Sequence, residues 1–203
     1  MGQPIVLTAN HGQVLYVTYV KHLSKMQQSI NNMRNREKSD REFYRTPKET
    51  VLLADELMDN VQWWECCAGD GAISNILSKV SYASDIYPLA KGIDKLDVLT
   101  CSKPNNIDAV ITNPPFTLAQ NILDRCLFEW DLPVLLLVRI EPFCTVKRKK
   151  YADLISNMHI VTNLIRFETE DGRIVNGNGT MRCAWMLFKP DYVGICKTRW
   201  VGW

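Results

Sequence analysis

The chain has 203 residues, of which 46% are hydrophobic and 23% charged, and its formal net charge is +2. This length suffices for one well-buried core plus a modest appendage, and it is too short for two full domains of usual size. No apolar run reaches the roughly 18 residues that a membrane-spanning helix needs, and residues 1–4 lack the basic start of a secretory signal, so neither membrane insertion nor export is expected.

The cysteines and histidines do not suggest a metal site. The seven cysteines form no zinc-type pairs of CxxC spacing, and the three histidines are isolated. An odd number of cysteines without an export signal predicts reduced thiols and a cytoplasmic location, which is the host cytoplasm if a phage encodes the chain. The net charge says little about partners, but Lys147-Arg148-Lys149-Lys150 forms the densest basic cluster.

The first 42 residues differ from the rest of the chain. Two β-like runs, residues 5–8 and 13–17, flank a possible hairpin turn. An apolar stripe with helical spacing follows over residues 19–33. Residues 1–42 are therefore predicted to form an N-terminal appendage, a hairpin plus a helix. That helix is expected to pack on the main body, and a homodimer seam is the alternative, so both a monomer and a homodimer through this segment stay open.

A second unit is predicted over residues 43–190, followed by a C-terminal tail over residues 191–203. Thr46-Pro47-Lys48-Glu49 indicates a helix start, in which Thr46 caps, Pro47 takes the first helical position and Glu49 completes a capping box. This helix is expected to run to about residue 58. The later elements are expected to be strands over residues 61–66, 80–84, 108–112, 133–139, 164–168 and 183–188, and helices over residues 71–79, 118–130 and 149–158.

Nearly continuous apolar strands that alternate with helices predict an α/β fold, in which helices cover both faces of a parallel sheet. Ligands of such sheets bind at the carboxyl ends of the strands. The first polar motif at such an end is Glu65-Cys66-Cys67-Ala68-Gly69-Asp70-Gly71-Ala72, between a strand and a helix. Its glycines permit a tight turn and a close approach of the backbone to a ligand, although a plain strand-to-helix turn has the same pattern.

Two acids follow later strands. Asp85 ends the next strand, in Ser84-Asp85-Ile86, where a carboxylate can accept both hydrogen bonds of a ribose diol, and a helix cap is the alternative. Asp97 has a similar but weaker placement.

The most specific motif is Asn113-Pro114-Pro115-Phe116, directly after the strand over residues 108–112. Two prolines cannot continue the strand ladder, and the first of them holds Asn113 extended. This stiff turn therefore presents an amide oxygen, a backbone carbonyl and an aromatic face together. A plain strand-ending turn could use the two prolines, but asparagine before them and phenylalanine after them are harder to explain structurally.

The Asn-Pro-Pro-Phe motif resembles the catalytic motif of S-adenosylmethionine-dependent amino-methyltransferases. The Glu65–Ala72 stretch resembles their cofactor-binding motif, and Ser84-Asp85-Ile86 resembles their acidic second motif. Tyr44-Arg45-Thr46-Pro47 resembles the segment that closes over the methionine end of the cofactor in one class of DNA adenine methyltransferases. The resemblance spans residues 43–190. Over this range the chain is similar to small phage-encoded DNA N6-adenine methyltransferases, including a C-terminal strand pair around residues 165–167 and 185–188.

This resemblance implies a Rossmann-like methyltransferase fold with a mostly parallel seven-stranded sheet, and S-adenosylmethionine as the cofactor, with no metal and no membrane. In the implied mechanism, the Asn113 side-chain oxygen and the Pro114 carbonyl polarise the amino group of a flipped-out adenine, on which Phe116 stacks. The implied catalytic residues are Asn113, Pro114, Pro115 and Phe116. The implied cofactor-binding residues are Thr46, Glu65, Cys66, Ala68, Gly69, Asp70, Gly71, Asp85, Ile86, Asp97 and Asn113. Tyr44, Arg45, Lys147, Arg148, Lys149 and Lys150 are expected to contact the nucleic acid.

Two features depart from the family pattern. Cys66 stands where the family commonly has proline, and no separate target-recognition domain is present. DNA is the expected partner, and the alternatives are the same chemistry on RNA or on a protein glutamine, or a non-catalytic nucleic-acid-binding subunit.

The C-terminal segment that contains Trp200 and Trp203, with Lys197 and Arg199, is interpreted as a packed tail, and base stacking by the tryptophans is the alternative.

Overall fold

The computed structural model describes residues 43–175 and 182–203, which belong to one compact unit. The predicted hairpin, helix and dimer seam within residues 1–42 lie outside the described residues. In the part of the chain that the structure describes, no helix is long and apolar enough to cross a membrane.

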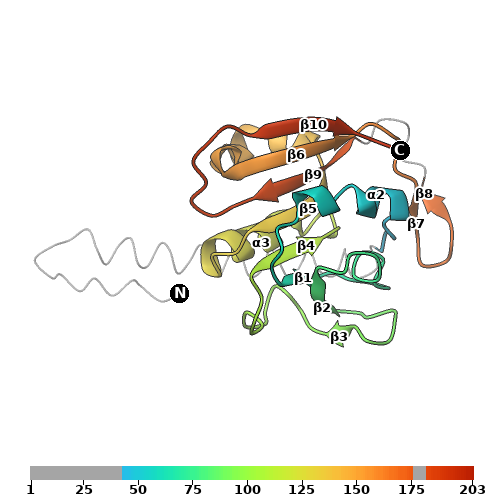
Figure 1. Cartoon of the computed structure of the whole chain (residues 1–203). Coiled ribbons are helices and arrows are strands. Elements are labelled where there is room, and N and C mark those ends of the chain that lie inside the picture. The colour runs from blue at the N-terminus through green and yellow to red at the C-terminus, as the bar shows by residue number, and fades with distance from the viewer. Residues whose placement is uncertain (1–42, 176–181) are drawn as a thin grey trace, which may run out of the picture. The chain divides into compact units, whose positions relative to one another are not determined.

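An eight-stranded sheet forms the centre of this unit, in the order β10-β6-β9-β5-β4-β1-β2-β3 (Figure 1). Every pairing in it is parallel except the two that β9 makes, with β5 and β6. Its strands are β1 (Trp63–Glu65), β2 (Val80–Asp85), β3 (Asp94–Lys95), β4 (Ala109–Thr112), β5 (Val134–Arg139), β6 (Ile155–Val161), β9 (Cys183–Phe188) and β10 (Lys197–Val201). The predicted α/β class with a mostly parallel, Rossmann-like sheet is confirmed. Its strands number eight rather than seven because β10 adds an edge strand.

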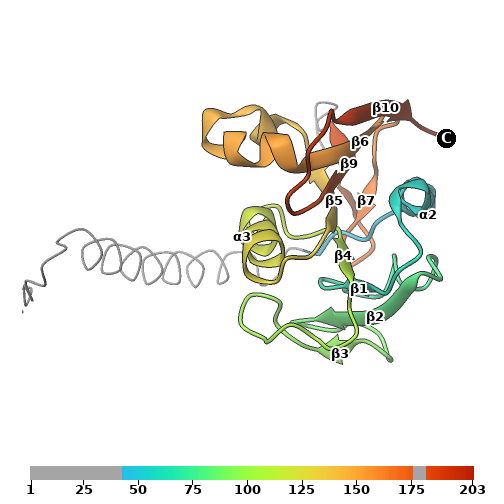
Figure 2. The same ribbon diagram turned by 60° about the vertical axis from the view of Figure 1, so that its left-hand side comes forward.

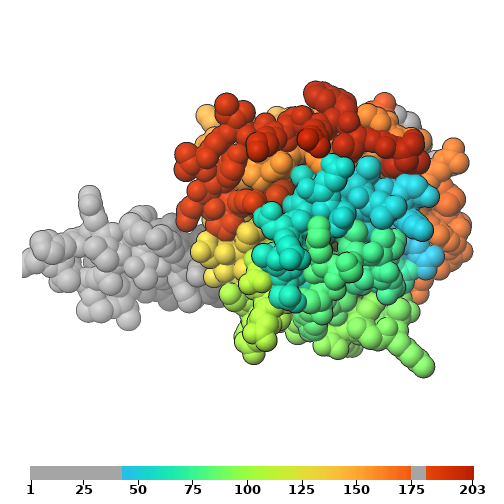
Figure 3. Space-filling model, viewed as in Figure 1, coloured from blue at the N-terminus to red at the C-terminus, as the bar shows by residue number. Residues whose placement is uncertain are grey.

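Helical segments cover both faces of the sheet, as the turned view makes plain (Figure 2). On one side lie α2 (Lys48–Leu52) and the 3₁₀ helix η1 (Asp55–Leu57), and on the other lie α3 (Ala119–Asp124), the π-helix η2 (Arg125–Glu129) and the 3₁₀ helices η3 (Glu141–Cys144) and η4 (Val146–Leu154). The space-filling view shows α2 and η1 on one face, beneath β10 (Figure 3).

Strand β5 lies at the centre of the sheet, and its sequence is almost wholly apolar. Val134, Leu136 and Val138 belong to the hydrophobic cluster on the α3 side, whereas Leu135 and Leu137 belong to the cluster on the α2 side. Because side chains alternate across a strand, a strand covered on both faces needs apolar residues at every position. Burying each such side chain contributes about 1.5–3 kcal/mol.

Three of the predicted helices differ from the structure. The helix expected from residue 46 to about residue 58 divides into α2 and η1, and its N-cap is Pro47 rather than Thr46, whose hydroxyl binds elsewhere. Residues 71–79 form turns rather than a regular helix, and Gly71 at their start has a φ of +81°, outside the helical region. The helix expected over residues 149–158 gives way after Leu154 to strand β6.

The predicted pairing of residues 165–167 with residues 185–188 is wrong. The segment around residue 167 forms the short strand β7 (Phe167–Glu168), which pairs with β8 (Ile174–Val175) in a separate two-stranded sheet. Strand β9 pairs with β5 and β6 instead. The start of β6 was expected to be helical, but the position of β6 between β9 and β10 outweighs the preference of its local sequence. Residues 197–201 of the predicted tail are β10, which pairs with β6.

Candidate active site

The sequence motifs meet at one edge of the sheet, where the parallel strands β2, β1 and β4 end side by side. The turn after β1 contacts the end of β2 directly, because the Ala68 amide donates to the Ser84 carbonyl at 3.0 Å. The Gly69 amide donates to Asp85 Oδ2 at 2.8 Å. The first motif and the acidic second motif therefore form one continuous surface.

Asp85 holds this surface together. Its Oδ2 accepts from Gly69, and its Oδ1 accepts from the Tyr87 amide at 2.8 Å. Burial raises the pKa of the Asp85 carboxyl, and the hydrogen bonds from backbone amides partly offset that rise. Each carboxylate oxygen can accept a second hydrogen bond, so the carboxylate keeps acceptor capacity for a ligand hydroxyl.

Glu65 is the most deeply buried acid of the site, with 1% of its surface exposed. Its Oε2 accepts a hydrogen bond from the Ser74 amide at 2.8 Å, which fixes the helical turns that follow the motif. Burial raises the pKa of Glu65 from 4.5 to about 8, and hydrogen bonds from Ser74 and Ile73 partly counteract this effect.

A pH dependence of stability follows from Glu65. Between pH 4.5 and about 8 the folded chain retains a proton that the unfolded chain releases, so the free energy of unfolding falls as the pH rises through this window. The maximum slope for one group is about 1.4 kcal/mol for each pH unit. The side chain introduced by Glu65→Gln cannot ionise, so the free energy of unfolding of this variant is expected not to show this fall. Urea denaturation at pH 5 and pH 8.5 measures the difference, with the exposed Glu49→Gln as the charge-matched control. Equal pH slopes for wild type and Glu65→Gln would contradict the buried-proton assignment.

Gly69 is required where it stands. Its φ is +55°, and a Cβ built on it would collide with the ring of Phe43. The ring of Phe43 thus packs directly against the backbone of the first motif, an approach that only glycine permits. The segment that precedes α2 therefore lies over the turn.

Arg45 ties this closing segment to two other elements. Its guanidinium forms ion pairs with Asp70 and, at 3.6 Å, with Glu168 of β7. Its backbone amide also donates to the Glu168 carbonyl at 2.8 Å. In this arrangement Arg45 links the first motif to β7, and its role as a nucleic-acid contact stays a prediction.

Asn113 is held by the same segment. Its Nδ2 donates to the Tyr44 carbonyl at 3.0 Å and to Thr46 Oγ1 at 3.1 Å. Both hydrogen bonds use the amide nitrogen, so the orientation of the amide group is fixed. Within residues 43–175 and 182–203, neither Asn113 Oδ1 nor the Pro114 carbonyl accepts a hydrogen bond. Two acceptors at the end of β4 are thus available to a ligand.

An aromatic cluster borders Asn113. The rings of Tyr44 and Phe116 stack, with centroids 6.1 Å apart and planes 23° apart. Phe167 of β7 packs against both rings, at 6.1 Å from Tyr44 and 6.4 Å from Phe116. The half-buried Phe116 is therefore fixed beside the two acceptors by residues from distant parts of the chain.

The other predicted cofactor-binding residues lie around this centre. Ala68, Gly71 and Cys66 are buried in and next to the first turn, and burial raises the pKa of the Cys66 thiol. Ile86 is half-buried after β2. Asp97 caps a turn, because its carboxylate accepts from the Leu99 amide at 3.0 Å and from the Thr100 hydroxyl at 2.6 Å.

The basic cluster lies on η4, where packing engages two of its members. Lys150 pairs with Asp124 of α3 at 2.6 Å, and Arg148 lies over the ring of Phe143 at 5.2 Å. Lys147 and Lys149 are exposed. No group of three or more metal-ligating side chains occurs among the described residues.

Sequence reasoning missed several contributors to the site. Phe43, Ser74, Phe167 and Glu168 each touch a predicted site residue, but only contacts between distant segments place them there. Phe43 carries a weak local signal, because it directly precedes the closing segment.

No protein-family model matches the sequence, and no curated protein sequence matches it either. Among solved structures, the chain is similar to the crystal structure of the 23S rRNA methyltransferase ErmE, with 16% sequence identity and a TM-score of 0.46. The similarity covers 72% of this chain and 68% of that one.

Proposed function

We propose that the chain transfers a methyl group from S-adenosylmethionine to the N6 amino group of adenine in DNA. The observation that carries this proposal is the orientation of Asn113. Its Nδ2 is bound to the Tyr44 carbonyl and Thr46 Oγ1, which directs Oδ1 to act as an acceptor. An oriented amide oxygen next to a proline carbonyl suits a substrate that brings two N–H hydrogens, as an exocyclic amino group does.

These acceptors address the chemical obstacle of the reaction. The lone pair of an exocyclic amino nitrogen is delocalised into the ring, which makes the nitrogen a poor nucleophile. Hydrogen bonds to Asn113 Oδ1 and the Pro114 carbonyl draw the nitrogen towards tetrahedral geometry and localise the lone pair. Their effect is largest because the closing segment holds them before the substrate arrives. Phe116 supplies a ring on which the base stacks, a contact worth about 1–3 kcal/mol.

The residues of the first turn fit the cofactor. Asp70 Oδ1 is buried and has no hydrogen-bond partner among the described residues, so it can accept from an ammonium group such as that of the methionine part. Asp85 retains acceptor capacity for ribose hydroxyls, and Arg45 of the closing segment pairs with Asp70. When bound there, S-adenosylmethionine supplies an electrophilic methyl group on a positively charged sulfur.

DNA is proposed as the polymer because the sequence motifs resemble those of DNA adenine methyltransferases, and exposed cations outside the site can bind a polyanion. Lys147 and Lys149 extend from η4, which follows β5 along the chain and is joined to it by η3. Lysines at such a position can bind phosphate groups and orient the polymer without reading its sequence. An adenine must leave the duplex to reach Asn113, at a cost of a few kcal/mol.

Methyl-labelled S-adenosylmethionine tests the choice of polymer. The protein is incubated with unmethylated duplex DNA, single-stranded DNA, RNA or a cell protein extract, and the label in each polymer is counted. We expect label in DNA. Label in RNA or in protein without label in DNA would contradict DNA as the substrate and assign the reaction to the labelled polymer. No label despite calorimetric binding of the cofactor would favour a non-catalytic subunit.

Thr46 gives a prediction about positioning. Thr46→Val removes one of the two acceptors that hold Asn113 Nδ2 while keeping the shape of this buried side chain. A hydrogen bond of this kind contributes about 1 kcal/mol, so kcat at saturating cofactor is expected to fall about fivefold. An unchanged kcat would show that Thr46 does not position Asn113.

Thr50 is the matched control for this variant. It is also a buried threonine, on α2, but its hydroxyl has no hydrogen-bond partner among the described residues. Thr50→Val removes an unsatisfied polar atom and is expected to leave kcat unchanged and the free energy of unfolding equal or higher. Denaturant unfolding and initial rates measure both.

A further inference from the structure

Strand β10 combines positive charge with exposed aromatic surface at the edge of the sheet. Lys197 and Arg199 are exposed, and Trp200 and Trp203 have 71% and 51% of their surface exposed. Cationic residues are a common protection of edge strands against pairing with another chain. Two largely exposed tryptophans have the opposite effect, so edge protection does not explain this combination.

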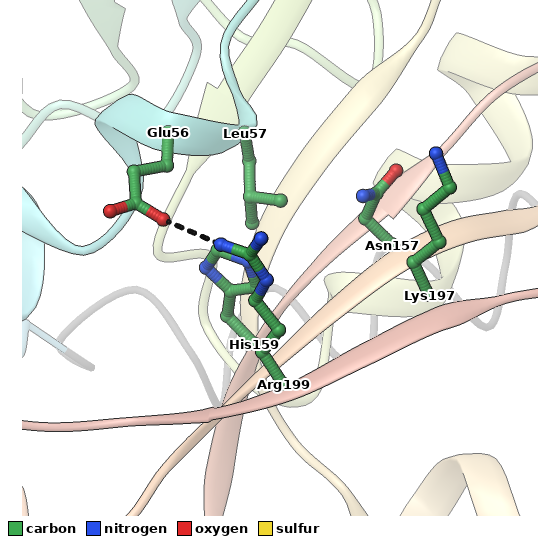
Figure 4. Close-up of a pocket in the computed structure, with 6 residues that line it drawn as sticks. All are labelled: Glu56, Leu57, Asn157, His159, Lys197 and Arg199. Carbon is green, nitrogen blue, oxygen red and sulfur yellow. Dashed lines mark hydrogen bonds and ion pairs between the residues drawn. The ribbon is translucent and has the colours of Figure 1, made fainter.

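The two cations line a pocket of about 200 Å³ on the η1 side of the sheet (Figure 4). Parallel pairing places Lys197 beside Asn157 of β6 and Arg199 beside His159. His159 is 3% exposed and lies with Nδ1 3.4 Å from the Leu53 carbonyl, which fixes its ring at the base of the pocket. Two cations, an imidazole and an amide in one pocket favour an anionic group such as a phosphate.

The acid in this pocket does not cancel its charge. Glu56 pairs with Arg199 at 3.3 Å, but both side chains are about two-thirds exposed. Such exposed pairs contribute little and exchange partners easily. Lys197 has no ion-pair partner among the residues that the structure describes. The pocket therefore keeps a positive charge that a phosphate can neutralise.

The tryptophans lie near the carboxyl end of β10, four strands from β4 in the sheet. Strand β10 runs parallel to β6, so its carboxyl end lies at the same edge as those of β1, β2 and β4. The Asn163 amide holds the Trp203 backbone through two hydrogen bonds, of 2.9 and 3.1 Å. Trp203 is thus fixed at this edge, while its ring remains half exposed.

We infer that β10 is a second contact for the nucleic-acid substrate, a deeper reading that rests on the proposed function. Lys197 and Arg199 bind a backbone phosphate in the pocket, and Trp200 and Trp203 stack on unpaired bases of the same strand. Side chains alternate between the two faces of β10, so Lys197 and Arg199 share one face and Trp200 lies on the other, whereas Trp203 follows the end of the strand. A polynucleotide that passes around this edge strand can therefore meet both the cations and the rings. Stacking rings beside a cationic groove are how proteins bind single strands without sequence preference.

Fluorescence anisotropy with a labelled single-stranded 20-nucleotide DNA, without cofactor, tests this inference. Trp200→Ala/Trp203→Ala is expected to weaken binding at least about tenfold, since each stacked base contributes strongly. Lys197→Ala/Arg199→Ala is expected to weaken binding and to lower the slope of log affinity against log salt by roughly 1–2. The matched control is Lys91→Ala/Lys95→Ala, because both lysines are exposed near β3 at the opposite edge. The control is expected to bind like wild type.

Trp200→Phe/Trp203→Phe retains stacking rings and is expected to recover most of the affinity, which separates stacking from misfolding. Binding of both β10 alanine variants like wild type, or no binding by wild type, would overturn the inference. A Trp200→Ala/Trp203→Ala variant that loses self-association but keeps DNA affinity would also overturn it and assign the surface to a second copy of the chain. Methyl transfer to DNA by wild type, with unchanged binding by both variants, would overturn this inference and leave the proposed function intact. Binding that depends on β10, without methyl transfer to any polymer, would support this inference and contradict the proposed function.

Discussion

Asn113→Ala is expected to lower kcat by about 10²–10³ while S-adenosylmethionine binds within about twofold of its wild-type affinity. The variant removes one of the two acceptors for the substrate amino group, which act only on the reacting nitrogen. The fixed hydrogen bonds from Nδ2 to Tyr44 and Thr46 make this oxygen a preorganised acceptor. Single-turnover rates and calorimetry with the cofactor separate the two effects.

Asn105→Ala provides the matched control, because Asn105 is an exposed asparagine in the loop before β4. Its rate and its cofactor affinity are expected to equal those of wild type. Wild-type turnover by Asn113→Ala would remove Asn113 from the mechanism. A large loss of cofactor affinity would instead assign Asn113 to cofactor binding rather than to the reaction.

Trp185→Ala is expected to lower the free energy of unfolding by about 3–5 kcal/mol. Trp185 lies in β9, is completely buried, and donates from Nε1 to the Thr50 carbonyl of α2 at 2.8 Å. The truncation leaves a large cavity between sheet and helix and a buried carbonyl without its donor. Because α2 follows the closing segment directly, the same change is expected to loosen the hold on Asn113. Urea denaturation measures the loss of stability.

Trp200→Ala is the control for this truncation, since Trp200 is 71% exposed and its loss creates no cavity. Its free energy of unfolding is expected to lie within about 0.5 kcal/mol of wild type. A small effect of Trp185→Ala would contradict the view that β9 and α2 are packed as one core.

The sequence predicted those strands whose burial is complete. Residues 183–188 are apolar at every position and residues 133–138 are apolar up to Arg139, as a strand covered on both faces requires, and these segments match β9 and β5. The first part of β6, residues 155–158, was predicted as the end of a helix because its mixed residues carry no clear period. Pairing with β9 and β10 determines its structure, and that pairing depends on residues distant in sequence.

At the candidate site too, local features could be predicted from the sequence, and contacts between distant residues could not. The turn after β1, Asp85 and the Asn113 motif could be placed from the sequence, because each lies at or directly after the carboxyl end of a strand, and these ends share one edge. The hydrogen bond from Asn113 to Thr46 spans 67 residues, and no local pattern predicts it. Thr46 was expected to cap a helix, as threonine before Pro-Lys-Glu commonly does. Its hydroxyl oxygen instead accepts a hydrogen bond from Asn113.

The identity of the methylated nucleoside tests the central claim most directly. Unmethylated duplex DNA is incubated with S-adenosylmethionine and either wild type or Asn113→Ala, digested to nucleosides and analysed by mass spectrometry. The proposed function predicts N6-methyladenine from the wild-type reaction and a trace at most from the Asn113→Ala reaction. A different methylated nucleoside, no methylated nucleoside with wild type, or equal N6-methyladenine with both proteins would contradict it.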